Sequence, residues 1–338
     1  MTPARIWRRL RGKPFGRLAD LLAGLLMLAT SAVGYLYAAK VPGLDPITIW
    51  PFWYWTVIFV ALGLVFAPLL RWRRATLVVG FALLTGLLLN EEPFYLAREI
   101  RYRDRPVRVL PPGDSLRVIT LNCGGGNEAP VRDALVLDPD VILLQESPGS
   151  RAIDRLLPEG WEHVGRIDTA VLVKGTLSAD EHPRWLAHEM HVVRAVPERI
   201  GRPITLISTH LVQPSVRTDI WRPFVWHRAA MLRESRTAGV GHLIEQQHRY
   251  GDLPVVIGGD FNAGNHDSVL PPLVRNGFRD AFREAGRGWP NTITADYPME
   301  RIDYIWVDEH FEALRSLVAY TPHSDHRMVV ADIALRQP

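Results

Sequence analysis

The sequence contains very little cysteine and very little lysine. Cys123 is its single cysteine, so no disulfide can form within the chain and no zinc site can be built from cysteines. Only three of its 39 basic residues are lysines, an arginine excess typical of GC-rich bacterial genomes. Internal repeats and low-complexity tracts are absent too, which excludes solenoid architectures. With 47% hydrophobic residues among 338, the chain has enough apolar material for one large core and an additional segment.

Positive charge is concentrated at the N-terminus. Residues 1–92 carry ten Lys and Arg and four Asp and Glu, a net charge of +6. The rest of the chain carries 29 basic and 32 acidic residues, a net charge of −3. The overall net charge of +3 therefore gives no indication of nucleic-acid binding, because the larger part of the chain is slightly acidic.

Three stretches of the N-terminal region carry no charge, at 21–39, 46–70 and 75–90. We interpret each as a transmembrane helix. The first two have 19 and 25 residues, enough to span a hydrocarbon core of about 30 Å, whereas the 16 residues of the third reach about 24 Å. The aromatic run 50–55 is typical of the headgroup level of a bilayer. A cleaved signal peptide is the alternative interpretation of the first stretch, which six basic residues precede.

Lysine and arginine near the ends of these stretches favour a cytoplasmic N-terminus. With three crossings, nine basic residues lie inside and six lie outside. We therefore expect a multi-pass protein of the bacterial inner membrane whose C-terminal domain is extracytoplasmic. Loss of the short third crossing would reverse the side of that domain.

A charged, proline-containing stretch at 93–115 is predicted to link the membrane anchor, 1–92, to a folded domain at 116–338. This domain contains four short apolar runs that end in polar residues, at 118–121, 141–144, 204–207 and 255–257. Such runs are typical of β-strands buried on both faces. The segments 129–137 and 225–247 are expected to be helices that cover them.

Polar residues follow all four predicted strands: Asn122, Glu146, His210, and Asp260 with Asn262. In open α/β sheets, sites lie at the carboxyl ends of the strands. Each residue alone has a structural explanation in a turn or cap. Their joint occurrence, followed by the segments 301–304 and 324–326, indicates a shared site. Cys123 alternates with Asn122 along its strand, so we expect it to point into the opposite, buried face rather than to act as a nucleophile.

Six segments resemble motifs of the endonuclease/exonuclease/phosphatase superfamily, in the same order and over 116–335. They are 118–122, 141–146, 208–211, 258–262, 301–304 and 324–326. The superfamily includes deoxyribonuclease I, apurinic endonucleases, neutral sphingomyelinases and inositol polyphosphate phosphatases. The resemblance implies a hydrolase of phosphate ester bonds with a four-layer α/β/β/α fold, a two-layered β-sandwich flanked by helices. Here the three predicted transmembrane helices precede that fold.

A phosphoesterase in a slightly acidic domain needs a cation to neutralise the phosphate oxygens. Carboxylate and amide oxygens suit Mg²⁺ or Mn²⁺. Glu146 is the predicted principal metal ligand, with Asn122 beside it and Asp325 as a further ligand. No other cofactor is predicted.

Asp260 is the predicted base that accepts a proton from the attacking water, and Asn262 would orient the water or the phosphate. His210 and His326 are expected to donate to the phosphoryl oxygens or to the leaving group. The resemblance suggests Asp303 as the carboxylate that holds His326 in one tautomer. If the water is activated differently, Asp303 would be more important for catalysis than Asp260.

The membrane anchor followed by this domain resembles the membrane-bound branch of the superfamily, including the teicoplanin-resistance proteins of actinomycetes. The segment 297–303 is the most similar to them. The resemblance implies a lipid-linked phosphate as substrate, and tethering raises the effective concentration of lipid headgroups at the site. A surface nuclease is the alternative, although the domain shows no basic, aromatic-rich patch for nucleic acid. A non-catalytic membrane scaffold is the third hypothesis, which the presence of Glu146, Asp260 and His326 disfavours.

Overall fold

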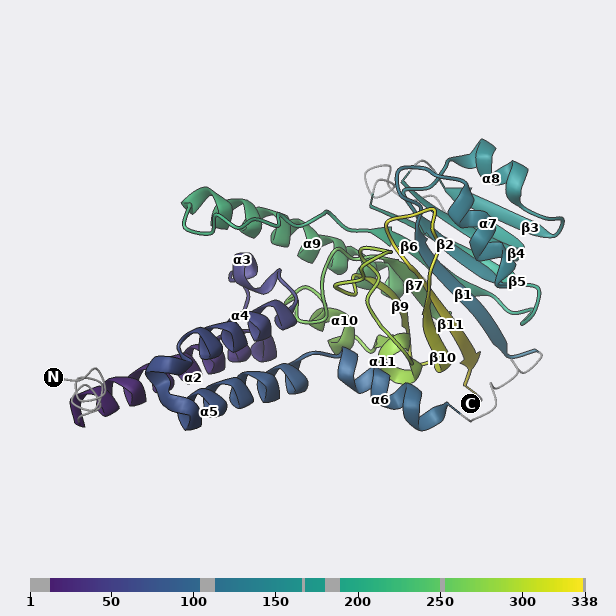
Figure 1. The fold of residues 1–338 in the computed structure, drawn as a ribbon. Helices are drawn as coiled ribbons and strands as arrows, with labels where there is room; N and C mark the ends of the chain where they lie inside the picture. Colours follow the sequence, from purple (N-terminus) through teal and green to yellow (C-terminus); the bar gives the residue numbers. More distant parts are fainter. Residues whose placement is uncertain (1–12, 104–112, 166–167, 180–188, 250–252, 337–338) are drawn as a thin grey trace.

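The computed structural model describes residues 13–103, 113–165, 168–179, 189–249 and 253–336 (Figure 1). The helices are α2 (Lys13–Ala39), α3 (Asp45–Thr48), α4 (Phe52–Val65), α5 (Ala67–Leu89), α6 (Glu92–Tyr102), α7 (Ala129–Val136), α8 (Ser150–Leu156), α9 (Pro223–Arg249), α10 (Pro271–Arg275) and α11 (Ala281–Ala285). The strands are β1 (Ser115–Asn122), β2 (Val141–Gln145), β3 (Trp161–Gly165), β4 (Thr169–Ala179), β5 (Met190–Pro197), β6 (Ile204–His210), β7 (Val255–Asp260), β8 (Arg279–Asp280), β9 (Asp303–Val307), β10 (Phe311–Ala319) and β11 (Met328–Leu335).

The strands of the C-terminal domain form one sheet that folds back on itself. Their order is β10-β11-β1-β2-β4-β5-β6-β7-β9-β8, with β3 paired to β4. The long strand β4 belongs to both halves, because 169–173 pairs with β2 and 175–179 pairs with β5. Gly175 lies at the change of partner with φ of +144°, and a Cβ there would lie 2.3 Å from the Val196 carbonyl oxygen. The bend therefore requires glycine.

Two pairs of the described strands are parallel, β1 with β2 and β6 with β7. Their registers place Asn122 opposite Gln145 and His210 opposite Asp260. The carboxyl ends of both pairs consequently carry the polar residues that the sequence singled out.

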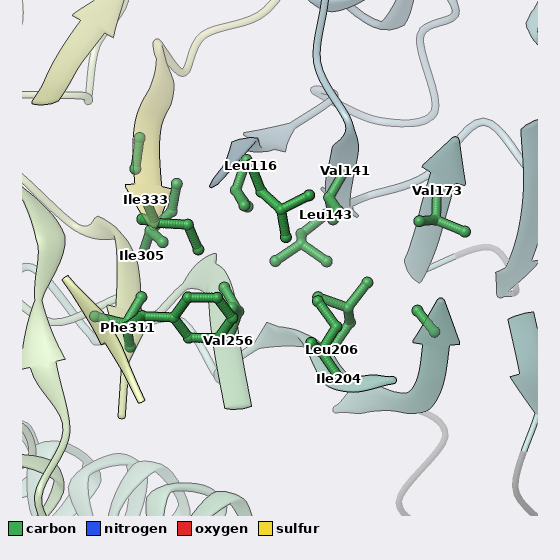
Figure 2. Close-up of a cluster of buried hydrophobic side chains, with 14 of the residues drawn as sticks. Leu116, Val141, Leu143, Val173, Ile204, Leu206, Val256, Ile305, Phe311 and Ile333 are labelled. Carbon is green, nitrogen blue, oxygen red and sulfur yellow. The ribbon is translucent and has the colours of Figure 1, made fainter. Parts of the chain in front are cut away.

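An apolar core lies between the two halves of the sheet (Figure 2). Leu143 of β2, Leu206 of β6 and Ile305 of β9 are completely buried in it. Helices cover the outer faces, with α7 and α8 on the β1–β2 side and α9 and α10 on the β6–β7 side. Each central strand thus contacts the inter-sheet core on one face and a helix on the other, which explains its uninterrupted apolar run. The predicted four-layer α/β/β/α fold is confirmed.

Among the described residues, two N-terminal helices are long and apolar enough to cross a membrane, Gly16–Ala39 and Ala67–Leu89. The prediction of three such helices is wrong for the stretch 46–70. That stretch contains the short α3 and the 14-residue α4, which rises only about 21 Å. Two prolines limit α4. Pro51 precedes its first residue and disfavours a helical residue before it, and α4 ends at Val65, just before α5 begins with Pro68 in its first turn. The predicted helix 75–90 is part of the longer α5, which kinks at Arg71 (φ 65°, ψ 151°).

The helices α2, α4 and α5 lie side by side in a bundle that projects from the C-terminal domain (Figure 1). Small residues bring α4 and α5 close together: a Cβ on Gly86 would lie 2.6 Å from Thr56 Oγ1. The outward faces expose many large apolar side chains, among them Leu21, Leu25, Leu28, Val57, Leu64, Leu77, Leu84 and Leu88. Water-soluble monomers rarely expose a contiguous apolar surface of this kind.

The bundle contacts the C-terminal domain directly. At the end of α2, Lys40 Nζ donates to the Asn265 carbonyl at 2.6 Å. At the end of α5, the Leu89 carbonyl lies 2.8 Å from His266 Nε2. Both long helices therefore end at the same neighbouring segment, 265–266.

Much of the predicted linker 93–115 is helical in the structure. It forms most of α6, in which the Tyr95 ring packs edge-on against Phe282 with 4.8 Å between ring centroids. Directly before α6, the Glu91 carboxylate accepts two hydrogen bonds from the Arg301 guanidinium at 2.9 and 3.0 Å. The junction is therefore packed against the domain.

Candidate active site

Polar side chains from six strand ends converge at one end of the sandwich. A cavity of about 370 Å³ opens there. Six of the predicted site residues line it: Glu146, His210, Asp260, Asn262, Asp325 and His326. The other two, Asn122 and Asp303, are buried behind this lining and are hydrogen-bonded to it. The structure thus brings all eight predicted residues together.

Glu146 follows β2 in a left-handed backbone conformation, with φ of 46°. For a residue other than glycine this conformation is uncommon and costs free energy, and such residues cluster at functional sites. The Gly125 amide donates to Glu146 Oε2 at 2.5 Å. Asn122 Nδ2 lies 3.2 Å from both Glu146 Oε1 and Asp260 Oδ2. The Asn122 amide therefore connects the two carboxylates that the sequence assigned to metal binding and to water activation.

Asp260 faces two imidazole rings. Its Oδ2 lies 3.7 Å from His210 Nε2 and 3.8 Å from His326 Nε2. Its Oδ1 accepts a hydrogen bond of 2.8 Å from the backbone amide of Asn262. Asn262 also has a left-handed backbone, with φ of 49°, and its side-chain amide donates to the Leu211 carbonyl at 2.9 Å. One carboxylate oxygen is therefore fixed by the backbone, and the other faces the histidines.

Each histidine is oriented by a second carboxylate. His326 Nδ1 lies 3.0 Å from Asp303 Oδ2, and His210 Nδ1 lies 2.9 Å from Asp168 Oδ1. Both rings consequently direct Nε2 toward Asp260. Asp168 precedes β4, belongs to no recognisable motif and was not among the residues predicted from the sequence. Its role depends on a contact with His210, 42 positions away, which no local pattern indicates.

The charges of the site shift three pKa values. Burial and the Asp303 carboxylate raise the pKa of Asp260 to about 6, against the opposing effect of the two histidines. Burial lowers the pKa of His326, but the Asp303 and Asp260 carboxylates outweigh it and raise the pKa to about 10. Burial also lowers the pKa of His210, and the hydrogen bond with Asp168 helps to raise it above its ordinary value. At neutral pH an ionised carboxylate therefore faces a protonated imidazole, that of His326.

Cys123 lies in the apolar cluster between β1 and α7, on the face opposite Asn122. Burial raises the pKa of its thiol. A buried thiol facing away from the cavity has no role in the chemistry of this site.

Residues 119–326 match the model of the Endonuclease/Exonuclease/phosphatase family. The chain belongs to this family. All eight site residues lie within the matched segment, and the protein is a hydrolase that acts on phosphate esters. The matched segment lies within the C-terminal domain, from β1 to β11. A search for similar curated proteins finds no match.

Solved structures of the endonuclease/exonuclease/phosphatase family share the fold. A family protein from Beutenbergia cavernae is 18% identical, with 66% of this chain and 72% of that chain covered and a TM-score of 0.50. One from Bacteroides thetaiotaomicron is 16% identical, with 67% and 100% covered and a TM-score of 0.54. A mannosyl-6-phosphatase from Bacteroides thetaiotaomicron is 14% identical, with 65% and 100% covered and a TM-score of 0.50. At these identities the likeness shows the fold alone.

Members of the endonuclease/exonuclease/phosphatase family depend on divalent metals, and the site contains suitable ligands. One atom each from Asp260, Asp303 and His326 lies within 4.8 Å of the others. Asp303 Oδ1 is buried and has no hydrogen-bond partner among the described residues, so it can accept a bond from a cation or from water. Glu146 and Asp325 face the same cavity. Several carboxylate oxygens so close together are suitable ligands for a hard divalent cation.

Proposed function

We propose that the protein is a membrane-anchored, divalent-metal-dependent phosphoesterase that hydrolyses phosphate ester or pyrophosphate bonds of lipid-linked phosphates. The observation that carries the proposal is the direct packing of the catalytic domain on an apolar helical bundle, through Lys40, Leu89 and the Glu91–Arg301 pair. This packing would hold the cavity at a fixed distance from a bilayer. Lipid phosphates would then meet the site at high effective concentration.

The direction of the helices supports an extracytoplasmic catalytic domain in the bacterial inner membrane. Both α2 and α5 end beside this domain, so their N-terminal ends point away from it, and the shorter apolar helix α4, packed against both, would return the chain between them. The basic residues Arg71, Arg73 and Arg74 lie at that far end of α5. Because basic residues accumulate on the cytoplasmic side of a membrane protein, the far end would be cytoplasmic.

We place the cation, Mg²⁺ or Mn²⁺, at Glu146, with Asn122 and Asp325 as further ligands. The alternative group of Asp260, Asp303 and His326 suits it less well, because His326 Nδ1 already bonds Asp303 at 3.0 Å and a protonated imidazole cannot ligate a metal. When bound, the cation would neutralise charge on the phosphate oxygens.

The remaining steps use the residues of the chain. Asp260 accepts a proton from a water molecule, and the water oxygen attacks phosphorus as the bond to the leaving oxygen breaks. The backbone amide of Asn262 fixes Asp260 Oδ1, and its side chain orients the water or the phosphate. His210 and His326 donate from Nε2 to the phosphoryl oxygens or to the leaving oxygen. Asp168 and Asp303 hold the two rings in that orientation.

The cavity lining favours a small phosphate headgroup over a nucleic-acid strand. It contains five carboxylate side chains, those of Glu146, Asp168, Glu189, Asp260 and Asp325. Within the described residues, its lining includes no lysine or arginine. A polyanionic strand needs several such contacts along its backbone, whereas one headgroup needs only the cation and the histidines.

The test is hydrolysis by full-length protein in detergent, with Mg²⁺, with Mn²⁺ and with a chelator. Substrates are lipid-linked phosphates and single- and double-stranded DNA. We expect metal-dependent phosphate release from the lipids alone, lost in Asp260→Asn and retained in the exposed control Glu309→Gln. Cleavage of DNA with the lipids untouched would replace the proposal by a surface nuclease. No hydrolysis of any substrate would indicate a non-catalytic scaffold.

A further inference from the structure

Residues 211–232 form an arm that projects from the catalytic domain on the same side as the helical bundle (Figure 1). The arm consists of the loop after β6 and the first part of α9. Five of its large apolar side chains are exposed: Val212 (38%), Val216 (56%), Trp221 (76%), Phe224 (47%) and Met231 (57%). Apolar side chains gathered on one projection are typical of a binding surface.

The arm is an ordered element rather than a loose loop. Trp226 Nε1 donates to the Ile220 carbonyl at 2.6 Å and closes the loop onto the helix. Arg217 binds Asp219 through two hydrogen bonds of 2.7 and 2.8 Å. Its guanidinium also lies over the Phe224 ring, 5.2 Å from the centroid. These contacts hold Trp221 in an exposed position on a defined backbone.

The position of the arm is set by a contact between α9 and α3. Arg233 binds Asp45 at 2.7 Å, where the chain enters α4 of the bundle. The ten residues of α9 before Arg233 extend about 15 Å beyond that contact. The aromatic run 50–55, with which α4 begins, lies just after Asp45 in the chain. The tip of the arm therefore reaches the level at which the bundle would enter a bilayer.

The chemistry of the arm suits a bilayer surface. Trp and Phe side chains are favoured at the boundary between headgroups and acyl chains. Arg217, Arg222 and Arg228 lie among them in the sequence, whereas Asp219 is the one carboxylate between 211 and 232. Basic residues of this kind attract anionic lipid headgroups.

The arm also leads into the catalytic cavity. Leu211, Val212 and Gln213, its first residues, line the cavity next to His210. We propose that the arm inserts its apolar tip into the bilayer surface and guides the phosphate group of a membrane lipid from the headgroup layer into the cavity. The inference rests on the proposed function, because it requires that the bundle lies in a membrane.

A fluorescent label at the tip tests insertion. Cys123, the native cysteine, is buried, so a thiol introduced by Trp221→Cys is the one that an environment-sensitive label reaches. The full-length protein is placed in nanodiscs of phosphatidylcholine and phosphatidylglycerol, with or without bromine near the glycerol end of the acyl chains. Val136→Cys is the matched control, since Val136 is 83% exposed on α7 at the other side of the domain.

We expect brominated lipid to quench the label at 221 and to leave the label at 136 unchanged. A label at 221 with water-like emission and no quenching would overturn the inference. An apolar environment without quenching by lipid would overturn it as well, because the tip would then be covered by protein or by a second copy of the chain. Quenching requires no turnover, so it stays informative if no lipid phosphate is hydrolysed and the proposed function fails.

A second measurement connects the arm to turnover. The double substitution Trp221→Ala with Phe224→Ala should lower hydrolysis of vesicle-embedded substrate about tenfold more than hydrolysis of a water-soluble phosphate ester. Val136→Ala should change neither rate. Equal losses on both substrates would contradict a role of the arm in reaching membrane lipid.

Discussion

Replacing Asp260 by asparagine should stabilise the protein and abolish its activity. The Asp260 carboxylate is buried, and burial together with the Asp303 charge raises its pKa from 3.8 to about 6. At about 1.4 kcal/mol per pKa unit, the ionised form opposes folding by about 3 kcal/mol. Asparagine keeps the shape and removes the charge. Loss of the base should lower the rate about 100- to 10,000-fold.

The gain in stability expected from Asp260→Asn depends on pH, because the pKa of Asp260 is shifted in the folded state. Because the pKa of Asp260 is higher in the folded state, its destabilising effect is absent below pH 3.8, grows as the pH rises and is complete above pH 6. Melting temperatures of full-length wild type and Asp260→Asn are compared in detergent with a chelator, which removes any contribution of a bound cation. The two proteins should melt alike near pH 4, and the variant should melt roughly 6 to 12 °C higher at pH 7.

The control is Glu309→Gln, because the Glu309 carboxylate is exposed in the turn after β9. This substitution should change neither the activity nor the melting temperature. An Asp260→Asn variant that melts at or below the wild-type temperature at pH 7 would refute the reasoning. In that case the two histidines would stabilise the ionised carboxylate more than its burial and the Asp303 charge destabilise it.

Three further predictions concern the site and its support. The rate should rise with pH through about 6, where Asp260 ionises, and fall near pH 10, where His326 loses its proton. The measurement is the pH–rate profile of wild type and of His326→Gln, and the variant should lose the fall in rate at alkaline pH. Glu146→Gln should raise the Mg²⁺ concentration for half-maximal rate about tenfold or more, measured by metal titration; an unchanged midpoint would move the cation elsewhere. Arg301→Ala should destabilise the protein by about 3 to 5 kcal/mol, because it leaves the carboxylates of Glu91 and Asp280 unpaired. Denaturant unfolding measures this, and a loss of stability below about 1 kcal/mol would contradict the prediction.

Local sequence pattern predicted much of the fold. The runs 118–121, 141–144, 204–207 and 255–257 all became strands, since a strand buried on both faces needs apolar side chains at every position. The alternation of side chains along β1 was sufficient to place Cys123 in the outer cluster. The six motifs also located the eight residues that meet at the cavity. The parallel strands end there, and β9 and β11, which are antiparallel to β7 and β1, begin there.

The features that the sequence did not reveal depend on long-range contacts or on backbone conformation. Uncharged composition predicted a long helix at 46–70, but breaks at Pro51 and at Phe66, just before Pro68, interrupt it, and composition alone takes no account of the amide hydrogen that proline lacks. The left-handed conformations of Glu146 and Asn262 are imposed by surrounding hydrogen bonds, since neither residue is a glycine. Asp168 and Glu91 have no local signal, because each acts through a partner far away in the chain.

The Glu91–Arg301 pair shows that the N-terminal region is part of the framework of the site. Arg301 is 1% exposed and binds Asp280 at 2.7 Å as well as Glu91 at 2.9 Å. Two residues later, Asp303 holds His326 at 3.0 Å. A fragment that begins after α6 would leave the buried Arg301 with one carboxylate in place of two, beside the strand that orients the histidine. The segment that joins α5 to α6 therefore supports the strand that carries Asp303, independently of any contact with lipid, and kinetic work should use a chain that includes Glu91.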